Sequence, residues 1–340
     1  MKESAIGQPL GASVASTLEQ MNKAGKARKP FFFALDYELQ EGIFLADPLG
    51  EGANTAGLQF AINGHHTPFV DNYPLPTLRS IRPERQERYA KRFSRIYQAL
   101  ERGDSFLANL TIRTPIELEG GLEAIYAHSH APYKLLIPER LVCFSPERFV
   151  RISGRTIATH PMKGTIDASL PKAAEHLLAD YKEGAEHYTI VDLMRNDLNR
   201  IARKVRVERF KYLSRIATSR GEILQMSSEV VGELGENWHE RIGDLLLELL
   251  PAGSISGAPK AKTYAVIREA EEIPRGFYTG ICGYYDGREL DSGVLIRYIE
   301  QDERGQYYYR SGGGVTINSR CTEEYDECIQ KVYLPCQSLS

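Results

Sequence analysis

Short apolar runs separated by polar residues recur along most of this chain, a pattern typical of β-strands. The first three runs predict strands at residues 31–35, 42–46 and 58–62. Similar runs follow closely between residues 106 and 162, interrupted by a Gly120-Gly121 turn. Further strands are expected at 204–209, 226–234, 278–285, 290–299 and 306–311. Strands therefore come in groups, as they do when neighbours pair antiparallel.

Segments with helical periodicity lie between these groups of strands. The charged, amphipathic stretch 82–103 predicts a helix that begins at Pro83-Glu84 and ends at a glycine. Further helices are expected at 122–128, 171–199, 238–250, 258–272 and 321–334. Grouped strands with helices as outer layers predict an α+β fold. No linker rich in Pro, Gly or Ser divides the chain, so we expect one catalytic domain over residues 1–340.

Composition excludes few enzyme classes but disfavours several kinds of partner. The chain has 340 residues, 42% of them hydrophobic, and a net charge of −3. Nucleic-acid and membrane-surface partners favour a basic excess, which is missing here. No apolar run approaches the roughly 18 residues of a membrane span, and the opening lacks the apolar core of a secretion signal. Five cysteines without a Cys-x-x-Cys pair favour reduced thiols in a cytoplasmic protein.

Lys163 is the first candidate for chemistry, because Pro161 and Gly164 flank it. Proline and glycine punctuate a chain, so this lysine is expected where a strand turns. An ammonium in a closed site loses hydration, and its pKa falls until the neutral amine can act as a nucleophile or base. The alternative is a surface lysine beside a turn, which is the common situation for a single lysine.

Two predicted helices carry carboxylates at the same spacing. Glu183 and Glu186 lie three residues apart, as do Glu324 and Glu327, with Lys331 four residues further on. Residues at i, i+3 and i+7 share a helix face, so each helix can direct two carboxylates one way. Carboxylates without Cys or His partners suit a hard cation such as Mg²⁺. The same spacing is also typical of ordinary surface glutamates.

Two glycine-rich segments and one arginine complete the candidates. Small residues at 251–257, followed by a proline, lead into a predicted helix and could expose backbone N–H groups to an anion, although they are not a Walker A loop. The run 312–314 consists of three glycines, which let a backbone approach a ligand closely or form a flexible turn. Arg297 ends a strand and would be costly to bury without a carboxylate.

Over residues 106–331 the chain resembles the chorismate-utilising family, whose members include anthranilate, aminodeoxychorismate, isochorismate and salicylate synthases. The matching segments are 145–149, 161–165, 185–199, 253–260, 278–284, 296–297, 312–314 and 324–327. The resemblance implies two large packed antiparallel β-sheets with helices outside, with a family core at 106–335 and a shortened N-terminal part at 1–105. With that shortening, we do not expect the tryptophan site that larger members have in this part.

Two positions favour component I of aminodeoxychorismate synthase within the family. Lys163 stands where anthranilate and isochorismate synthases usually have alanine, and the resemblance implies that it attacks ring carbon C2 and expels the C4 hydroxyl. Leu107 stands where the members that add water carry a base lysine. A leucine cannot activate water. Leu107 also replaces a glutamine common in aminating members, and Gln225 replaces a usual histidine.

The resemblance also implies roles for the remaining candidates. Glu147 is expected to protonate the departing hydroxyl. The expected Mg²⁺ ligands are Glu186 and Glu327, with Glu183 and Glu324 acting through water. The expected grip on the two carboxylates of chorismate comes from Arg297, Tyr278, Lys331, Ser256 and the amides near Gly257 and Gly313.

We therefore expect an aminodeoxychorismate synthase component I that makes 4-amino-4-deoxychorismate on the way to p-aminobenzoate and folate. The chain shows no Cys-His-Glu arrangement of a glutaminase, so its ammonia is expected from a separate glutamine amidotransferase subunit. Two alternatives stay open: an anthranilate synthase component I, and a non-catalytic module that binds chorismate or another dicarboxylate.

Overall fold

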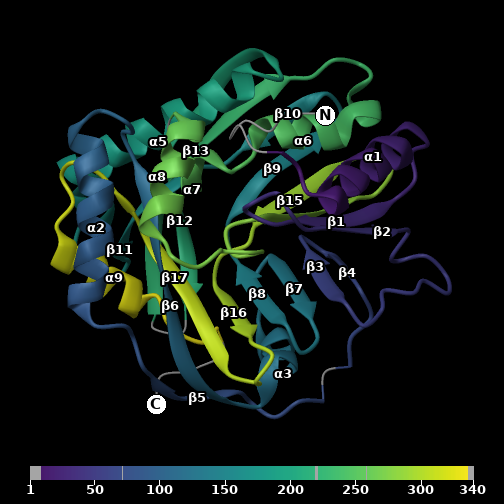
Figure 1. Cartoon of the computed structure of the whole chain (residues 1–340). Helices are drawn as coiled ribbons and strands as arrows, with labels where there is room; N and C mark the ends of the chain where they lie inside the picture. The colour runs from purple at the N-terminus through teal and green to yellow at the C-terminus, as the bar shows by residue number, and fades with distance from the viewer. Residues whose placement is uncertain (1–8, 71, 219–220, 258, 336–340) are drawn as a thin grey trace.

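Two antiparallel sheets form the centre of the molecule, with helices around them (Figure 1). The computed structural model describes residues 9–70, 72–218, 221–257 and 259–335. All pairings among the described strands are antiparallel, as the grouping of strands along the sequence predicts. The expected α+β class and the two packed sheets are therefore confirmed.

The first sheet has nine strands, in the order β11-β13-β10-β9-β15-β14-β1-β2, with β12 also paired to β13. Its strands are β1 (Phe31–Leu35), β2 (Gly42–Ala46), β9 (Arg148–Ser153), β10 (Thr156–Thr159), β11 (Met162–Asp167), β12 (Arg203–Thr218), β13 (Gly221–Glu233), β14 (Ile281–Tyr285) and β15 (Leu290–Val294). Neighbours such as β1 and β14 are distant in sequence, so the sheet joins both ends of the chain.

The second sheet has eight strands, in the order β4-β3-β7-β8-β16-β17-β6-β5. Its strands are β3 (Gln59–Ile62), β4 (His65–His66), β5 (Thr77–Ile81), β6 (Ala108–Glu119), β7 (Tyr133–Ile137), β8 (Leu141–Ser145), β16 (Tyr298–Gln301) and β17 (Tyr307–Val315). The pair β6–β17 matters most for the site, because its register sets Asn109 opposite Gly314 and Thr111 opposite Gly312.

The helices cover the outer faces and edges of the sheets (Figure 1). They are α1 (Ala12–Lys26), α2 (Gln86–Glu101), α3 (Gly121–His128), α4 (Ala173–Ala179), α5 (Tyr181–Asn199), the 3₁₀ turn η1 (Trp238–Arg241), α6 (Ile242–Leu249), α7 (Gly253–Ser256), α8 (Lys260–Ala270) and α9 (Cys321–Gln330). Helices α2, α8 and α9 pack beside β6 and β17, whereas α1 covers β1 and β2 and α6 packs against α1. No helix among the described residues is both long and apolar enough to cross a bilayer.

Buried apolar side chains hold the two sheets together. Phe32 of β1 stacks on Phe60 of β3 with ring centroids 4.5 Å apart, which brings one strand of each sheet into contact. A larger core lies between the nine-stranded sheet and helices α1, α5 and α6. A third cluster joins α2, α8 and α9 to β6 and β17. This packing sets the distances across which the candidate residues face one another.

Several boundaries differ from those predicted by the sequence. The segment 171–199 forms two helices instead of one, because Asp180 takes an extended conformation and its side chain accepts from the Glu183 amide at 2.9 Å. The three glycines at 312–314 belong to β17 rather than to a turn after it. Helix α1, which the sequence reading missed, has hydrophobic residues on only one face.

Candidate active site

One cavity of about 420 Å³ gathers most of the predicted site residues. Lys163 comes from β11, Glu186 from α5, and Glu147 from the turn between β8 and β9. The lining also includes Tyr278, Arg297, Gly313, Glu327 and Lys331. These residues are spread over 185 positions of sequence, so only the packing of both sheets against α5 and α9 brings them together.

The Lys163 amine faces the first acidic helix. Its Nζ lies 2.7 Å from Oε2 of Glu186, and its side chain is about one third exposed. Gly164 has φ 85°, and a side chain there would come within 3.1 Å of Glu183 Oε2, so glycine lets this helix approach the strand. Burial disfavours the ammonium, but the charges of Glu186, Glu327 and Glu183 outweigh it and raise the pKa of Lys163. The expected fall of this pKa is therefore wrong for this arrangement.

The second acidic helix approaches the cavity from the other side. Lys331 Nζ lies 2.6 Å from Glu327 Oε1 and donates to the Gly312 carbonyl at 2.8 Å. A side chain at Gly313 would come within 3.2 Å of Glu324 Oε2. The glycines of β17 therefore let α9 lie close to the strand. Burial raises the pKa of Glu324, whose exposed fraction is 6%.

The four carboxylates offer only oxygen donors, the chemistry that Mg²⁺ prefers. Glu186 and Glu327 line the cavity, whereas Glu183 and Glu324 are not among its described lining residues. In the part of the chain that the structure describes, no three acidic, His or Cys side chains converge closely enough to ligate one ion, and the Lys163 ammonium is paired with Glu186. The donor set fits a hard cation, although binding one would require these side chains to move.

Glu147 is the candidate acid of the site. Its Oε1 accepts a hydrogen bond from Ser254 Oγ of α7 at 2.8 Å. Burial raises the pKa of Glu147, and the Ser254 bond and the charges of Arg297 and Lys331 only partly oppose this. Burial therefore favours a carboxyl that keeps its proton, as a general acid requires. Sequence reasoning missed Ser254, although it had singled out the segment that contains it.

Arg297 is half-buried in the cavity wall. Its Nε donates to the Tyr333 hydroxyl at 2.9 Å, and no described carboxylate forms an ion pair with it. Its backbone φ is 54°, and that of the neighbouring Thr279 is 64°, a conformation that β-branched residues rarely adopt. A guanidinium held in strained backbone without a carboxylate is suited to receive an anionic ligand.

Two predicted carboxylate contacts lie outside the described cavity lining. Ser256 is fully buried, and its hydroxyl donates to the carbonyls of Pro251 and Ala252 at 3.3 and 3.1 Å. A side chain at Gly257 would overlap the Leu107 carbonyl, so this glycine packs against β6. Both residues have packing and backbone contacts in this structure, whereas Ser254 and Ile255 of the same segment line the cavity. Their roles as contacts for a substrate carboxylate stay predictions.

Other lining residues bear on the choice between reactions. Leu107 lines the cavity and supplies no base. Asn109 also lines it, and its buried Oδ1 has no hydrogen-bond partner among the described residues. Sequence reasoning missed Asn109, whose only signal was a polar residue within an apolar strand. Gln225 pairs with Thr165 across β11 and β13 and is not among the described lining residues.

Comparison with known proteins places this arrangement in one family. The profile of chorismate binding enzymes matches residues 51–336. A "PabA-like protein" of Haemophilus influenzae is 48% identical over 94% of this chain and 96% of its own length. Aminodeoxychorismate synthase component 1 of Bacillus subtilis is 31% identical over 78% of this chain and 60% of its own length. The crystal structure of anthranilate synthase component I from Streptococcus pneumoniae superposes with a TM-score of 0.65 at 28% identity, over 75% of this chain and 58% of that one.

Proposed function

The chain belongs to the family of chorismate binding enzymes, and we propose that it is an aminodeoxychorismate synthase component I. The proposed reaction converts chorismate and ammonia to 4-amino-4-deoxychorismate. The single observation that carries the proposal is the placement of the Lys163 amine in one cavity with the Glu147 carboxyl. The other predicted reactions of the family have no use for an amine at this position.

The proposed sequence uses these two groups in turn. The neutral Lys163 amine attacks ring carbon C2, both conjugated double bonds of the ring shift, and the C4 hydroxyl leaves as water with a proton from Glu147. Ammonia then attacks C4, both double bonds shift back, and the bond from C2 to Lys163 breaks. Lys163 must first lose a proton and its ion pair with Glu186, because an ammonium is no nucleophile. A tethered amine replaces one difficult displacement with two easier ones.

Attraction between cationic side chains and the two carboxylates of chorismate is proposed to bind the substrate. Arg297, which has no described carboxylate partner, and Lys331 would receive the carboxylates of chorismate, with Tyr278 and the Gly313 amide beside them. Glu186 and Glu327 would hold Mg²⁺, which would supply positive charge for the ring carboxylate. Glu183 and Glu324 would support it from behind.

Ammonia is proposed to come from a separate glutamine amidotransferase subunit, with free ammonia as a poorer substitute. The support is the sequence, which shows no glutaminase triad. The relative described as PabA-like is consistent with a place in p-aminobenzoate biosynthesis.

The test is direct product analysis. The purified chain is incubated with chorismate, Mg²⁺ and ammonium, and the products are identified by mass and retention time. We expect aminodeoxychorismate, formed only when ammonium is present. Anthranilate with pyruvate would assign the chain to anthranilate synthase, and isochorismate would assign it to the water-adding members. Chorismate binding without turnover, with Glu147 and Lys163 both dispensable, would favour the non-catalytic module.

A further inference from the structure

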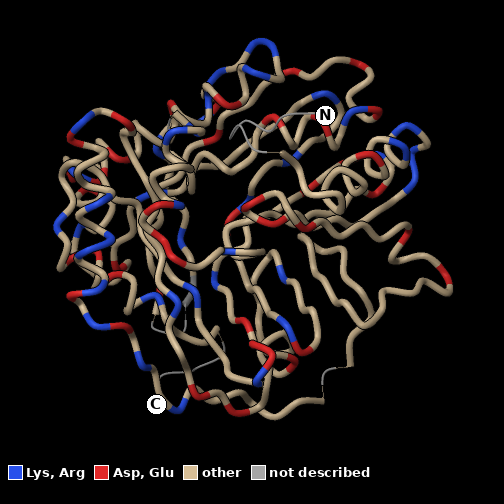
Figure 2. The backbone as a smooth tube through the Cα atoms, viewed as in Figure 1, with Lys and Arg blue, Asp and Glu red and all other residues tan. Residues whose placement is uncertain are grey.

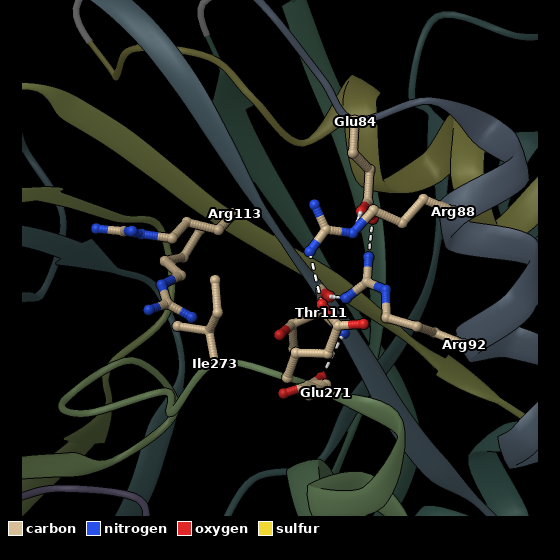
Figure 3. A pocket seen from close by; sticks show the side chains of 9 residues that line it. Glu84, Arg88, Arg92, Thr111, Arg113, Glu271 and Ile273 are labelled. Atoms are coloured by element: carbon tan, nitrogen blue, oxygen red, sulfur yellow. Dashed lines mark hydrogen bonds and ion pairs between the residues drawn. The ribbon is translucent and has the colours of Figure 1, made fainter.

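A second, smaller cavity lies on strands β6 and β17, apart from the catalytic one. It measures about 70 Å³ and is bounded by α2, by Thr111 and Arg113 of β6, by Arg310 of β17, and by residues 271–273 after α8 (Figure 3). Its lining shares no residue with that of the catalytic cavity. A volume of this size exceeds the roughly 10–15 Å³ that one water needs, and it admits only a small molecule.

Four guanidinium groups converge on this cavity. Arg88 and Arg92 come from α2, whose basic residues follow one another at the left edge of Figure 2, and Arg113 and Arg310 come from the paired strands. Arginine groups brought together in this way repel one another unless carboxylates or a bound anion separate them. The number of carboxylates within reach therefore decides whether the cavity can accept an anion.

On the strand side, one carboxylate serves two arginines. Glu300 Oε1 accepts from Arg113 Nε at 2.5 Å and from Arg310 Nε at 3.0 Å. Arg310 also donates to the Pro274 carbonyl at 2.9 Å, which fixes its position. A single carboxylate thus neutralises only one of these two guanidinium charges.

On the helix side, Glu84 pairs with both Arg88 and Arg92, and Glu272 lies 2.7 Å from Arg88. Glu271 also lines the cavity, but both its oxygens accept from Arg275, which is not part of the lining. Apart from that neutral pair, the four guanidinium groups form ion pairs with three carboxylates among the described residues, those of Glu84, Glu272 and Glu300. One positive charge remains.

The guanidinium of Arg92 has a donor that the described residues leave without an acceptor. It is nine-tenths buried, and its Nη1 donates to the Thr111 carbonyl at 2.9 Å. Its buried Nε has no acceptor among the described residues. A buried charged donor without an acceptor is costly, and a bound oxygen atom would relieve that cost.

We propose that this cavity is a binding site for one small oxyanion, held by Arg92, Arg113 and Arg310. Guanidinium groups match the oxygens of phosphate, sulfate or a carboxylate with paired hydrogen bonds. The net positive charge favours an anion over a neutral guest, and the volume excludes a nucleotide or an aromatic acid. The site lies two residues along β6 and β17 from Asn109 and Gly312 of the catalytic cavity, so both sites share a strand pair.

The experiment titrates inorganic phosphate into the full chain at constant ionic strength and follows binding by calorimetry and thermal unfolding. We expect binding at millimolar phosphate or below and a higher melting temperature. Sulfate should compete. Acetate should compete only if the site also binds carboxylates. Acetate competition therefore distinguishes a site for phosphate and sulfate alone from one that also binds carboxylates.

Variants locate the site. Arg92→Gln and Arg113→Gln should each weaken phosphate binding by about tenfold or more. Lys91→Gln removes the same charge from the exposed side of α2 and should leave affinity within about twofold. Arg297→Gln, in the catalytic cavity, should also leave it unchanged. The proposal would be overturned by any of three results. The chain does not bind phosphate at about 10 mM, or Arg92→Gln and Arg113→Gln bind it as tightly as the unsubstituted chain. The third result is that Arg297→Gln loses binding. Should Arg92→Gln fail to fold, the more exposed Arg113→Gln still decides the question.

Discussion

Two neighbouring regions of this molecule bury charge in opposite ways. Arg275 is 1% exposed, and its guanidinium donates to both Glu271 oxygens at 2.8 Å, to the Asn109 carbonyl at 2.7 Å and to Thr279 Oγ1 at 3.3 Å. In the catalytic cavity, Arg297 has no described acidic partner and the carboxylates around Lys163 outnumber nearby cations. A structural charge is neutralised within the protein, whereas a charge that serves a ligand is left partly open.

Among substitutions in the catalytic cavity, replacing Lys163 should lower turnover most. Lys163→Ala should lower turnover by at least about 10³-fold, because the covalent route loses its nucleophile. Lys163→Arg keeps a positive charge beside Glu186 without a nucleophilic amine and should be equally inactive. Turnover is measured with ammonium as the nitrogen source. Unchanged turnover in either variant would mean that this lysine serves only as an ion-pair partner.

Breaking the closed pair should cost stability instead of chemistry. Arg275→Met leaves the Glu271 carboxylate buried without its partner, and the free energy of unfolding should fall by about 3–5 kcal/mol. Arg268→Met is the matched control, since its side chain is 40% exposed and its pair with Glu38 is worth at most about 1 kcal/mol. Urea unfolding measures both. Similar losses in the two variants would contradict the distinction between closed and exposed pairs.

Glu147 lies in the catalytic cavity, so replacing it should lower activity and not stability. Glu147→Gln keeps the hydrogen bond to Ser254 within reach but cannot give a proton, so kcat should fall by about 10²–10³-fold. The urea midpoint should change little, because no structural ion pair is lost. A large fall in stability with little change in kcat would show that Glu147 has a structural role and does not act as the general acid.

Acid should weaken the buried surroundings of His239, a neutral group that the protein shields from protonation. Burial and the nearby Arg28 lower its pKa from 6.5 to about 4, and its Nδ1 lies 2.6 Å from the Tyr285 hydroxyl. The unfolded chain takes up a proton near pH 6.5 while the folded chain resists until about pH 4, so stability is lost on acidification between these values. The loss should be of order 1–3 kcal/mol. His239→Gln should flatten this pH dependence of urea unfolding, and an unchanged slope would exclude His239 as its source.

The local sequence pattern was enough to predict most helices and strands and, within the site, the two helices with paired carboxylates. Apolar runs located β1 and β2 to the residue, and the E-x-x-E spacing correctly indicated two helices that carry paired carboxylates. Boundaries failed where a single side chain decided them, as at Asp180, whose carboxylate caps α5 and divides the expected helix. They also failed at 312–314, where the neighbouring strand keeps three glycines extended.

The sequence by itself determined the residue types of the site and the periodicity of the elements that carry them, because both depend on near neighbours. Only the tertiary structure decided that Ser254 bonds Glu147 across 107 positions, that Ser256 turns to the backbone, and that the carboxylates facing Lys163 raise its pKa. Charges and hydrogen bonds act through space, so their sum depends on how the two sheets and α5 and α9 pack together.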